Sequence, residues 1–236
     1  MAMVSLTYRD ATVIVIGEEV GRYGGAYGVT RDLMKAYGPE RVINTPISEA
    51  AIVGAAVGAA MTGLRPVAEL MYVDFLGMSM DQLANQAAKI RYMFGGQAGV
   101  PMVLRTQGGT GRSAGAQHSQ SLEAWVMPTP GLRLAMPATV ADAHHLLRQS
   151  LTKPDPVVFI EHKALYTRKE DVDLDAEPLA RGKAGRPHRS LAPGCGSAAA
   201  RVDTPSFAFR PCGPLGSATA SPRYHPWRLS TASQRR

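Results

Sequence analysis

The stretch TPISEAAIVGAAVGAAMTGLRPVAEL, residues 45–70, decides the fold expected for this chain. Its middle, rich in Gly and Ala, predicts a long buried helix whose small side chains let another backbone or a flat ligand come close. Ser48 is expected to be the N-cap, and Glu49 falls in the first turn, where unpaired backbone N–H groups favour a carboxylate. Gly63 and Pro66 then end the helix, and a short apolar strand follows.

Outward from this stretch, short apolar runs alternate with helical patterns. Strands are expected at 11–16, 42–44, 67–71, 100–105, 132–136 and 156–161, and helices at 31–38, 78–93 and 139–151. Alternation of this kind with short joints predicts an α/β fold, with a mostly parallel sheet covered by helices on both faces. His144 and His145 fall within the last of these helices and are expected at the surface.

The charge of the chain is distributed unevenly. Residues 1–180 carry 16 Lys/Arg against 18 Asp/Glu, whereas residues 181–236 carry 10 against 1, so the overall charge of +7 comes from the second part. A nearly neutral body argues against a nucleic-acid-binding protein. Pro, Gly, Arg and Ser dominate residues 181–236, which predicts one domain over 1–180 and then a basic tail. That tail is either disordered or an off-frame translation of GC-rich DNA.

Cysteine usage and hydropathy limit the class of protein further. Both cysteines, Cys195 and Cys212, lie in the basic tail, so the expected domain has no disulfide framework and no cysteine metal site. No apolar stretch reaches the length of a membrane span, and the N-terminus lacks a signal-peptide pattern. A cytoplasmic location without membrane partners is expected.

Beyond Glu49, three features offer chemistry. His118 lies in a Gly-rich loop after a strand, where α/β proteins place ligands, although a lone histidine is more often structural. Met71 and Phe75 follow another strand and either belong to the core or sandwich a flat ring. The segment GGTGRSAG, residues 108–115, is only superficially similar to a phosphate-binding loop, because it lacks the Gly-Lys-Ser/Thr ending.

Four segments follow one another in the order ISEAAIVGAAVGAAMTGLRPVAEL, DFLGMSMDQLANQAAKIRYMFGG, GAQHSQSLEAW and PGLRLAMPATVADA. Their order and spacing resemble the beta subunit of the thiamine-diphosphate-dependent 2-oxo acid dehydrogenases, which include the pyruvate, acetoin and branched-chain enzymes. The resemblance covers residues 6–177 and implies the pyrimidine-binding domain of the transketolase-like fold. It also implies oxidative decarboxylation of pyruvate or a related 2-oxo acid, with acyl transfer to a lipoyl domain.

The resemblance implies roles for five residues. Glu49 matches the glutamate that hydrogen-bonds the aminopyrimidine ring of thiamine diphosphate and so activates the cofactor. Met71 and Phe75 match residues that pack against the pyrimidine. His118 matches the histidine that assists proton transfer and passes the acyl group to the lipoyl arm, and Gln117 lies beside it.

The resemblance also implies metal ions and partners. Some members of the family hold potassium near the positions of Met102, Ser150, Leu151, Lys153 and Asp155, and Lys153 departs from the family pattern. The cofactor pyrophosphate is held through Mg2+ by a GDG…N motif, and this chain contains no GDG. An alpha subunit is therefore expected to supply the Mg2+ site, so that the active site lies between subunits. A lipoyl-bearing acyltransferase is the second expected partner.

Three departures from the family keep an alternative open. The helix that usually separates the equivalents of Tyr8 and Val13 is missing, and Pro128 stands where relatives commonly have histidine. The C-terminal domain of the family is replaced by residues 181–236. The alternative is a non-catalytic, truncated remnant that at most binds an alpha subunit.

Overall fold

The computed structural model describes residues 10–174, so the predicted tail at 181–236 and its two cysteines lie outside the described part. Strands and helices alternate along the chain. Their order is β1 (Val13–Glu18), α2 (Leu33–Tyr37), β2 (Val42–Thr45), α3 (Glu49–Met61), β3 (Arg65–Glu69), the 3-10 helix η1 (Val73–Ser79), the π-helix η2 (Asp81–Ala87), α4 (Ala88–Met93), β4 (Val103–Gly108), the 3-10 turn η3 (Ala116–His118), α5 (Glu123–Val126), β5 (Arg133–Ala135), α6 (Val140–Leu151), β6 (Val157–His162) and the 3-10 turn η4 (Lys163–Leu165).

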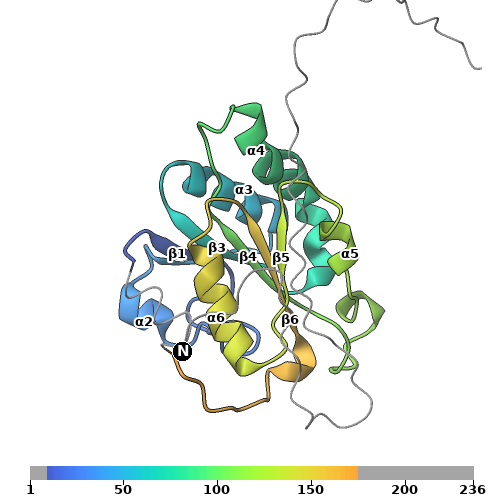
Figure 1. Ribbon diagram of the computed structural model, residues 1–236. Coiled ribbons are helices and arrows are strands. Elements are labelled where there is room, and N and C mark those ends of the chain that lie inside the picture. Colours follow the sequence, from blue (N-terminus) through green and yellow to red (C-terminus); the bar gives the residue numbers. More distant parts are fainter. Residues whose placement is uncertain (1–9, 175–236) are drawn as a thin grey trace, which may run out of the picture. The chain divides into compact units, whose positions relative to one another are not determined.

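The strands form one sheet of six in the order β2-β1-β3-β4-β6-β5 (Figure 1). Every neighbouring pair is parallel, which confirms the predicted parallel sheet. Pro66 is tolerated near the start of β3 because the strand pairs there on one side only: Pro66 lies opposite Ile14 of β1, whereas the pairing with β4 begins at Val67.

Two apolar cores, one on each face of the sheet, hold the helices in place. Ile52 and Val53 of α3 belong to the same core as Leu104 of β4, and the apolar residues of α4 and α5 join them. On the opposite face, the residues of α2 and α6 share a core with Val15 and Phe159. Helices therefore cover both faces, as the alternating sequence predicts (Figure 1).

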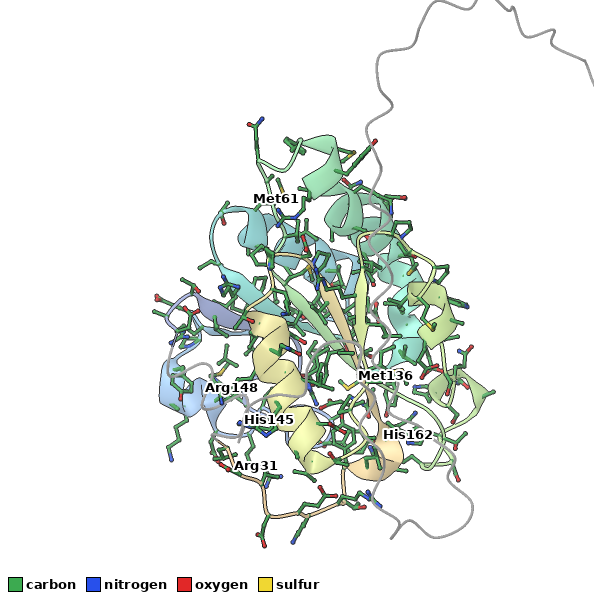
Figure 2. The ribbon with its side chains drawn as sticks, viewed as in Figure 1. Arg31, Met61, Met136, His145, Arg148 and His162 are labelled. Atoms are coloured by element: carbon green, nitrogen blue, oxygen red, sulfur yellow. The ribbon has the colours of Figure 1, made fainter. Side chains whose placement is uncertain are left out.

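The surface position predicted for His144 is wrong. His144 is only 6% exposed, and burial together with the neighbouring His145 lowers its pKa. Counting along α6, His144, Leu147 and Leu151 are spaced at three and four residues and form the buried stripe of the helix. His145, which is labelled on α6 in Figure 2, lies beside this stripe and is half-buried.

The single helix predicted for residues 78–93 is replaced by three helical types. A 3-10 helix ends at Ser79, a π-helix follows over Asp81–Ala87, and only Ala88–Met93 is α-helical. The apolar spacing places Leu83 and Ile90 correctly inside, since both are buried. It cannot reveal the hydrogen-bond register, because apolar residues spaced three to four positions apart do not specify which carbonyl each backbone N–H bonds.

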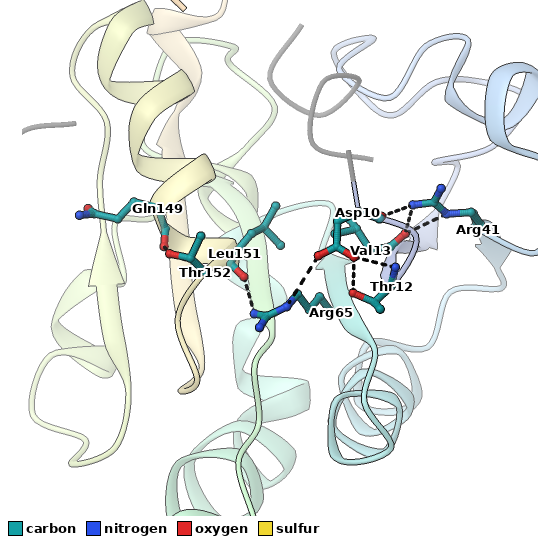
Figure 3. A network of polar contacts seen from close by, with 8 residues as sticks. All are labelled: Asp10, Thr12, Val13, Arg41, Arg65, Gln149, Leu151 and Thr152. Atoms are coloured by element: carbon teal, nitrogen blue, oxygen red, sulfur yellow. Dashed lines mark hydrogen bonds and ion pairs between the residues drawn. The ribbon is translucent and has the colours of Figure 1, made fainter. Parts of the chain in front are cut away.

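At the amino-terminal edge of the sheet, two arginines tie together segments far apart in sequence (Figure 3). Arg65 at the start of β3 donates to the carbonyl of Leu151 at 2.6 Å, and its Nε lies 3.8 Å from Asp10 Oδ2. Arg41 donates to the carbonyls of Val13 and Asp10 at 2.8 and 2.6 Å. These contacts fix the amino ends of the strands and leave the loops at the opposite edge available for a site.

Arg148, labelled on α6 in Figure 2, donates to the carbonyl of Leu174 at 2.9 Å and ties the end of the described chain to this helix. Among residues 10–174, no helix is both long enough and apolar enough to cross a membrane.

Candidate functional site

The predicted catalytic and cofactor-binding residues lie at the carboxyl edge of the sheet. Because all strands are parallel, β1, β2, β3, β4 and β6 end at this same edge. Glu49 follows β2, Met71 and Phe75 follow β3, and Gln117 and His118 follow β4. Ligands of open α/β sheets bind at this edge, so the topology gathers residues that are up to 69 positions apart in sequence.

A pair of carboxylates lies on the β1–β2 side of the site. Glu49 is the first residue of α3, is half-buried and follows the N-cap Ser48, as predicted. The hydroxyl of Ser48 does not cap the helix but donates to the carbonyl of Pro46 at 3.2 Å. Glu18 ends β1, directly opposite Thr45 of β2, and is 8% exposed.

Glu18 is a site residue that the sequence analysis did not single out. Burial is the main cause that raises its pKa, and the carboxylates of Glu49 and Glu19 raise it further. Its Oε1 has no hydrogen-bond partner among the described residues. A glutamate two positions after the apolar run Val13–Ile16, at the end of the strand, is the signal that would have pointed to it, because a strand end at this edge is where open α/β sheets bind ligands.

On the other side of the site, the rings of Tyr72, Phe75 and His118 pack edge to face with one another. The His118 ring lies 4.8 Å from the Tyr72 ring and 5.5 Å from the Phe75 ring, and Tyr72 and Phe75 lie 5.8 Å apart, measured between ring centres. His118 Nδ1 is buried and has no hydrogen-bond partner among the described residues. Gln117, in the same 3-10 turn, is exposed. The structure therefore brings His118 and Phe75 into contact, and Tyr72 joins them.

Met71 lines a small pocket together with Tyr27, Glu69, Arg105 and Gln107. Gln107 Nε2 donates to the Met71 carbonyl at 2.6 Å, which fixes the backbone of the residue expected against the pyrimidine. The Oε1 of Gln107 is buried without a partner among the described residues. The pocket is thus lined by Met71, whose backbone is held in place, and by Gln107, whose Oε1 has no hydrogen-bond partner among the described residues.

A buried ionic network forms the floor of this pocket. Arg105, 2% exposed, donates to Glu69 Oε2 at 2.6 Å and also pairs with Glu161. Tyr166 donates to Glu161 at 2.7 Å, and its ring stacks on Tyr27 with 4.3 Å between ring centres. Burial alone would lower the pKa of Arg105, but Glu161 and Glu69 raise it well above its ordinary value. Three neighbouring strands are thereby joined under the site.

The residues expected to hold potassium gather elsewhere, at the amino ends of β4 and β6 and the carboxyl end of α6. The Met102 carbonyl accepts from the Val157 N–H at 3.0 Å, and the Leu151 carbonyl accepts from Arg65, as Figure 3 shows. The Asp155 carboxylate pairs with Arg91 and with Arg133. A carbonyl oxygen has two lone pairs, so an ion is compatible with these bonds, but Asp155 is already neutralised.

Ser150 and Lys153 complete this predicted potassium set. The Ser150 carbonyl accepts from the Lys153 N–H at 3.1 Å, in the turn that ends α6. Among residues 10–174, no group of three His, Cys, Asp or Glu side chains is arranged to hold a metal ion.

Residues 1–169 match the family described as transketolase, pyrimidine binding domain. The chain is 47% identical over 167 residues to the pyruvate dehydrogenase E1 component subunit beta of Porphyra purpurea, covering 71% of this chain and 50% of that protein. It is 46% identical over 188 residues to the acetoin:2,6-dichlorophenolindophenol oxidoreductase subunit beta of Bacillus subtilis, covering 75% and 55%. The chain thus spans about half the length of the curated relatives it matches.

One solved structure, described as a split gene transketolase, inactive beta4 tetramer, superimposes with a TM-score of 0.62 and 19% sequence identity. The superposition covers 78% of this chain and 55% of the other chain. This likeness supports the fold of the sheet and its helices.

Proposed function

Because the chain belongs to the transketolase pyrimidine-binding domain family, we propose that it is the beta subunit of a thiamine-diphosphate-dependent 2-oxo acid dehydrogenase. The observation that carries this proposal is Glu49, which opens α3 beside the buried Glu18 at the carboxyl edge of the sheet. The names of the relatives favour pyruvate as substrate, with acetoin-type chemistry as a close variant.

The residues present fit thiamine diphosphate. The buried Oε1 atoms of Glu18 and Gln107 and the Nδ1 atom of His118 have no partner among the described residues, so a polar ligand would satisfy groups that are otherwise costly to bury. When bound, the cofactor would supply a nucleophilic carbanion for the 2-oxo acid and a thiazolium ring that accepts the electron pair as CO2 is lost. Glu49 would hold the pyrimidine ring nitrogen, Met71 and Phe75 would flank the ring, and His118 would move a proton.

The proposal includes two protein partners. An alpha subunit provides the Mg2+ and pyrophosphate site, which accords with the missing GDG motif and with relatives named as subunits and components. A lipoyl-bearing acyltransferase then receives the acyl group. The cytoplasmic location expected from the sequence belongs to the same proposal, and fractionation of cells tests it.

Reconstitution tests the proposed function directly. The full chain is mixed with the alpha subunit of a pyruvate dehydrogenase, and release of CO2 from carboxyl-labelled pyruvate is followed with dichlorophenolindophenol as electron acceptor. We expect release that depends on thiamine diphosphate. Glu49→Gln should reduce it by about 100-fold or more, since a general acid–base contribution of 100- to 10,000-fold is typical.

Glu40→Gln is the matched control, because Glu40 is an exposed carboxylate away from the site and should leave turnover unchanged. If this chain binds the alpha subunit but the resulting complex releases no CO2, the enzyme proposal is wrong and the non-catalytic remnant is the better description.

A further inference from the structure

The loop that carries His118 is closed at its base. The Gly109 N–H donates to the Gln120 carbonyl at 2.8 Å, so the two ends of loop 109–120 meet. Gly109 has a φ of +82°, and a Cβ built there would lie 2.3 Å from His162 Nε2. The base of the loop therefore packs directly against the end of β6, which leaves no room for a side chain. His162, the last residue of β6, is labelled in Figure 2.

Lys163 holds this loop from the β6 side. It is the first residue after β6 and is only 5% exposed. Its ammonium group donates to the backbone carbonyl of His118 and lies 4.9 Å from the centre of the Tyr72 ring. Burial lowers the pKa of Lys163, Asp74 raises it and Arg112 lowers it. A buried ammonium is costly unless it is paired and hydrogen-bonded, so these contacts determine its position.

Asp74 holds the same loop from the β3 side. It lies in η1, and its Oδ1 accepts from the Gln120 N–H at 3.0 Å. Its carboxylate also attracts the Lys163 ammonium group, so the two charges partly neutralise each other inside the site. Two residues of loop 109–120, His118 and Gln120, are thus held by opposite charges from segments that follow two different strands.

We propose that Asp74 and Lys163 are positioning residues that hold the His118 turn against Tyr72 and Phe75. Lys163 acts on the backbone of His118 and not on its imidazole, so it determines where the ring lies and performs no step of the reaction. The effect of this arrangement on turnover rests on the proposed function, whereas the restraint of the loop can be tested without it.

Limited trypsin digestion of the full chain tests the restraint. Cleavage after Arg112, an exposed residue inside the loop, is followed by mass spectrometry in the wild type and in variants. We expect Lys163→Met to be cleaved there about tenfold faster, because losing one hydrogen bond from a charged donor raises the population of the open loop by about that factor. Lys163→Arg keeps a donor and should restore the wild-type rate. Lys169→Met, which alters an exposed lysine, is the control.

The pair Asp74→Ala and Asp74→Asn covers the case in which Lys163→Met does not fold. Asparagine keeps the acceptor for the Gln120 N–H, so Asp74→Ala should be cleaved faster than Asp74→Asn. Equal cleavage after Arg112 in the folded variants and in Lys169→Met would overturn the proposal.

Kinetics with an alpha subunit add the readout that a merely structural role would not change. We expect Lys163→Met to lower kcat about tenfold with an unchanged KM for pyruvate, and Lys163→Arg to recover kcat. Equal losses in both variants would overturn the positioning role. If the wild type does not turn over, the proposed function fails, while the digestion result still decides whether the loop is held as described.

Discussion

At the residue scale, the site contains two carboxylates that do not share the same surroundings. Glu18 is buried at the end of β1, whereas Glu49 is half-buried at the start of α3. Burial raises the pKa of Glu18, and Glu49 is the next largest cause. Two carboxyl groups, one at the end of a strand and one at the start of a helix, thus offer oxygen atoms to a polar ring at the same edge of the sheet.

Glu18 makes stability depend on pH in a defined direction. A raised pKa means that the folded state binds the proton more tightly, so the wild type loses stability as pH rises from the ordinary value of 4.5 through the folded pKa. Glu18→Gln cannot ionise, so its free energy of unfolding should rise relative to that of the wild type as pH rises through that window. Above the window, the difference between the two proteins should be constant. Urea unfolding at several pH values between about 4 and 8 measures this. Glu40→Gln, with an exposed carboxylate, should show no such trend, and a flat difference for Glu18→Gln would contradict the expectation.

Arg105 is the residue on which the floor of the pocket depends. Arg105→Met leaves the buried carboxylates of Glu69 and Glu161 without their cation, which should lower the free energy of unfolding by about 3–5 kcal/mol. Arg112→Met removes an exposed guanidinium group that lies 4.8 Å from the Tyr27 ring, and it should lower the free energy of unfolding far less than Arg105→Met does. Urea unfolding of both variants measures the two losses in free energy of unfolding. Similar losses would show that the ionic network of Arg105 contributes little to stability.

At the element scale, two helix starts with the same kind of N-cap residue behave differently. Thr139 caps α6, since its Oγ1 accepts from the Asp142 N–H at 3.0 Å. Ser48 precedes α3, but its hydroxyl donates to the Pro46 carbonyl and leaves the helix N–H groups open. The open end of α3 lies at the carboxyl edge of the sheet, where an anionic or polar ligand would be favoured.

This difference predicts different effects of alanine. Thr139→Ala should lower the free energy of unfolding by about 1 kcal/mol, because a half-buried helix end loses its cap. Ser48→Ala should cost only a few tenths of a kcal/mol, since it removes no cap. Thermal unfolding of the two variants side by side is the measurement. A larger loss in Ser48→Ala than in Thr139→Ala would show that the capping geometry is wrong.

The ends of α6, β4 and β6 also provide the test for potassium. If carbonyls near Met102 and Leu151 bind the ion, K+ should raise the melting temperature relative to an equal concentration of Na+, because a ligand that binds only the folded state stabilises it. Equal melting temperatures in the two salts would remove potassium from the proposal. Arg65→Met is the control variant, because it removes the guanidinium group that already donates a hydrogen bond to the Leu151 carbonyl.

At the scale of the whole molecule, the described chain holds one half of the proposed cofactor site. Glu49, Met71 and Phe75 are the residues proposed for its pyrimidine side, and the chain has no GDG motif for the pyrophosphate. Calorimetric titration with thiamine diphosphate and Mg2+ should therefore show at least about 100-fold weaker binding to the chain alone than to its complex with an alpha subunit, which is about 2.7 kcal/mol. Equal affinities would mean that this chain binds the pyrophosphate by other groups.

The sequence predicted the fold class because burial leaves a direct record in it. Each predicted strand overlaps an observed one, and α6 runs from Val140 to Leu151, almost as its cap and apolar spacing indicate. The helical types within residues 73–93 and the burial of His144 were not predicted. The hydrogen-bond register that distinguishes the helical types leaves no clear pattern of apolar residues in the sequence. A polar residue such as His144 on the buried stripe of a helix cannot be told from a surface residue by its type alone.

By itself, the sequence determined the parallel α/β sheet, the position of Glu49 at the start of α3, and the placing of Met71, Phe75 and His118 after strands. These follow from local rules, because hydrophobic spacing, caps and turn residues act over a few positions. The tertiary structure alone decided that Glu18 is buried where the charge of Glu49 raises its pKa, that Arg105 joins Glu69 to Glu161, and that Asp74 and Lys163 contact the His118 loop. The strand order β2-β1-β3-β4-β6-β5 brings these residues together, and contacts between residues far apart in the chain leave no periodic signal in one sequence.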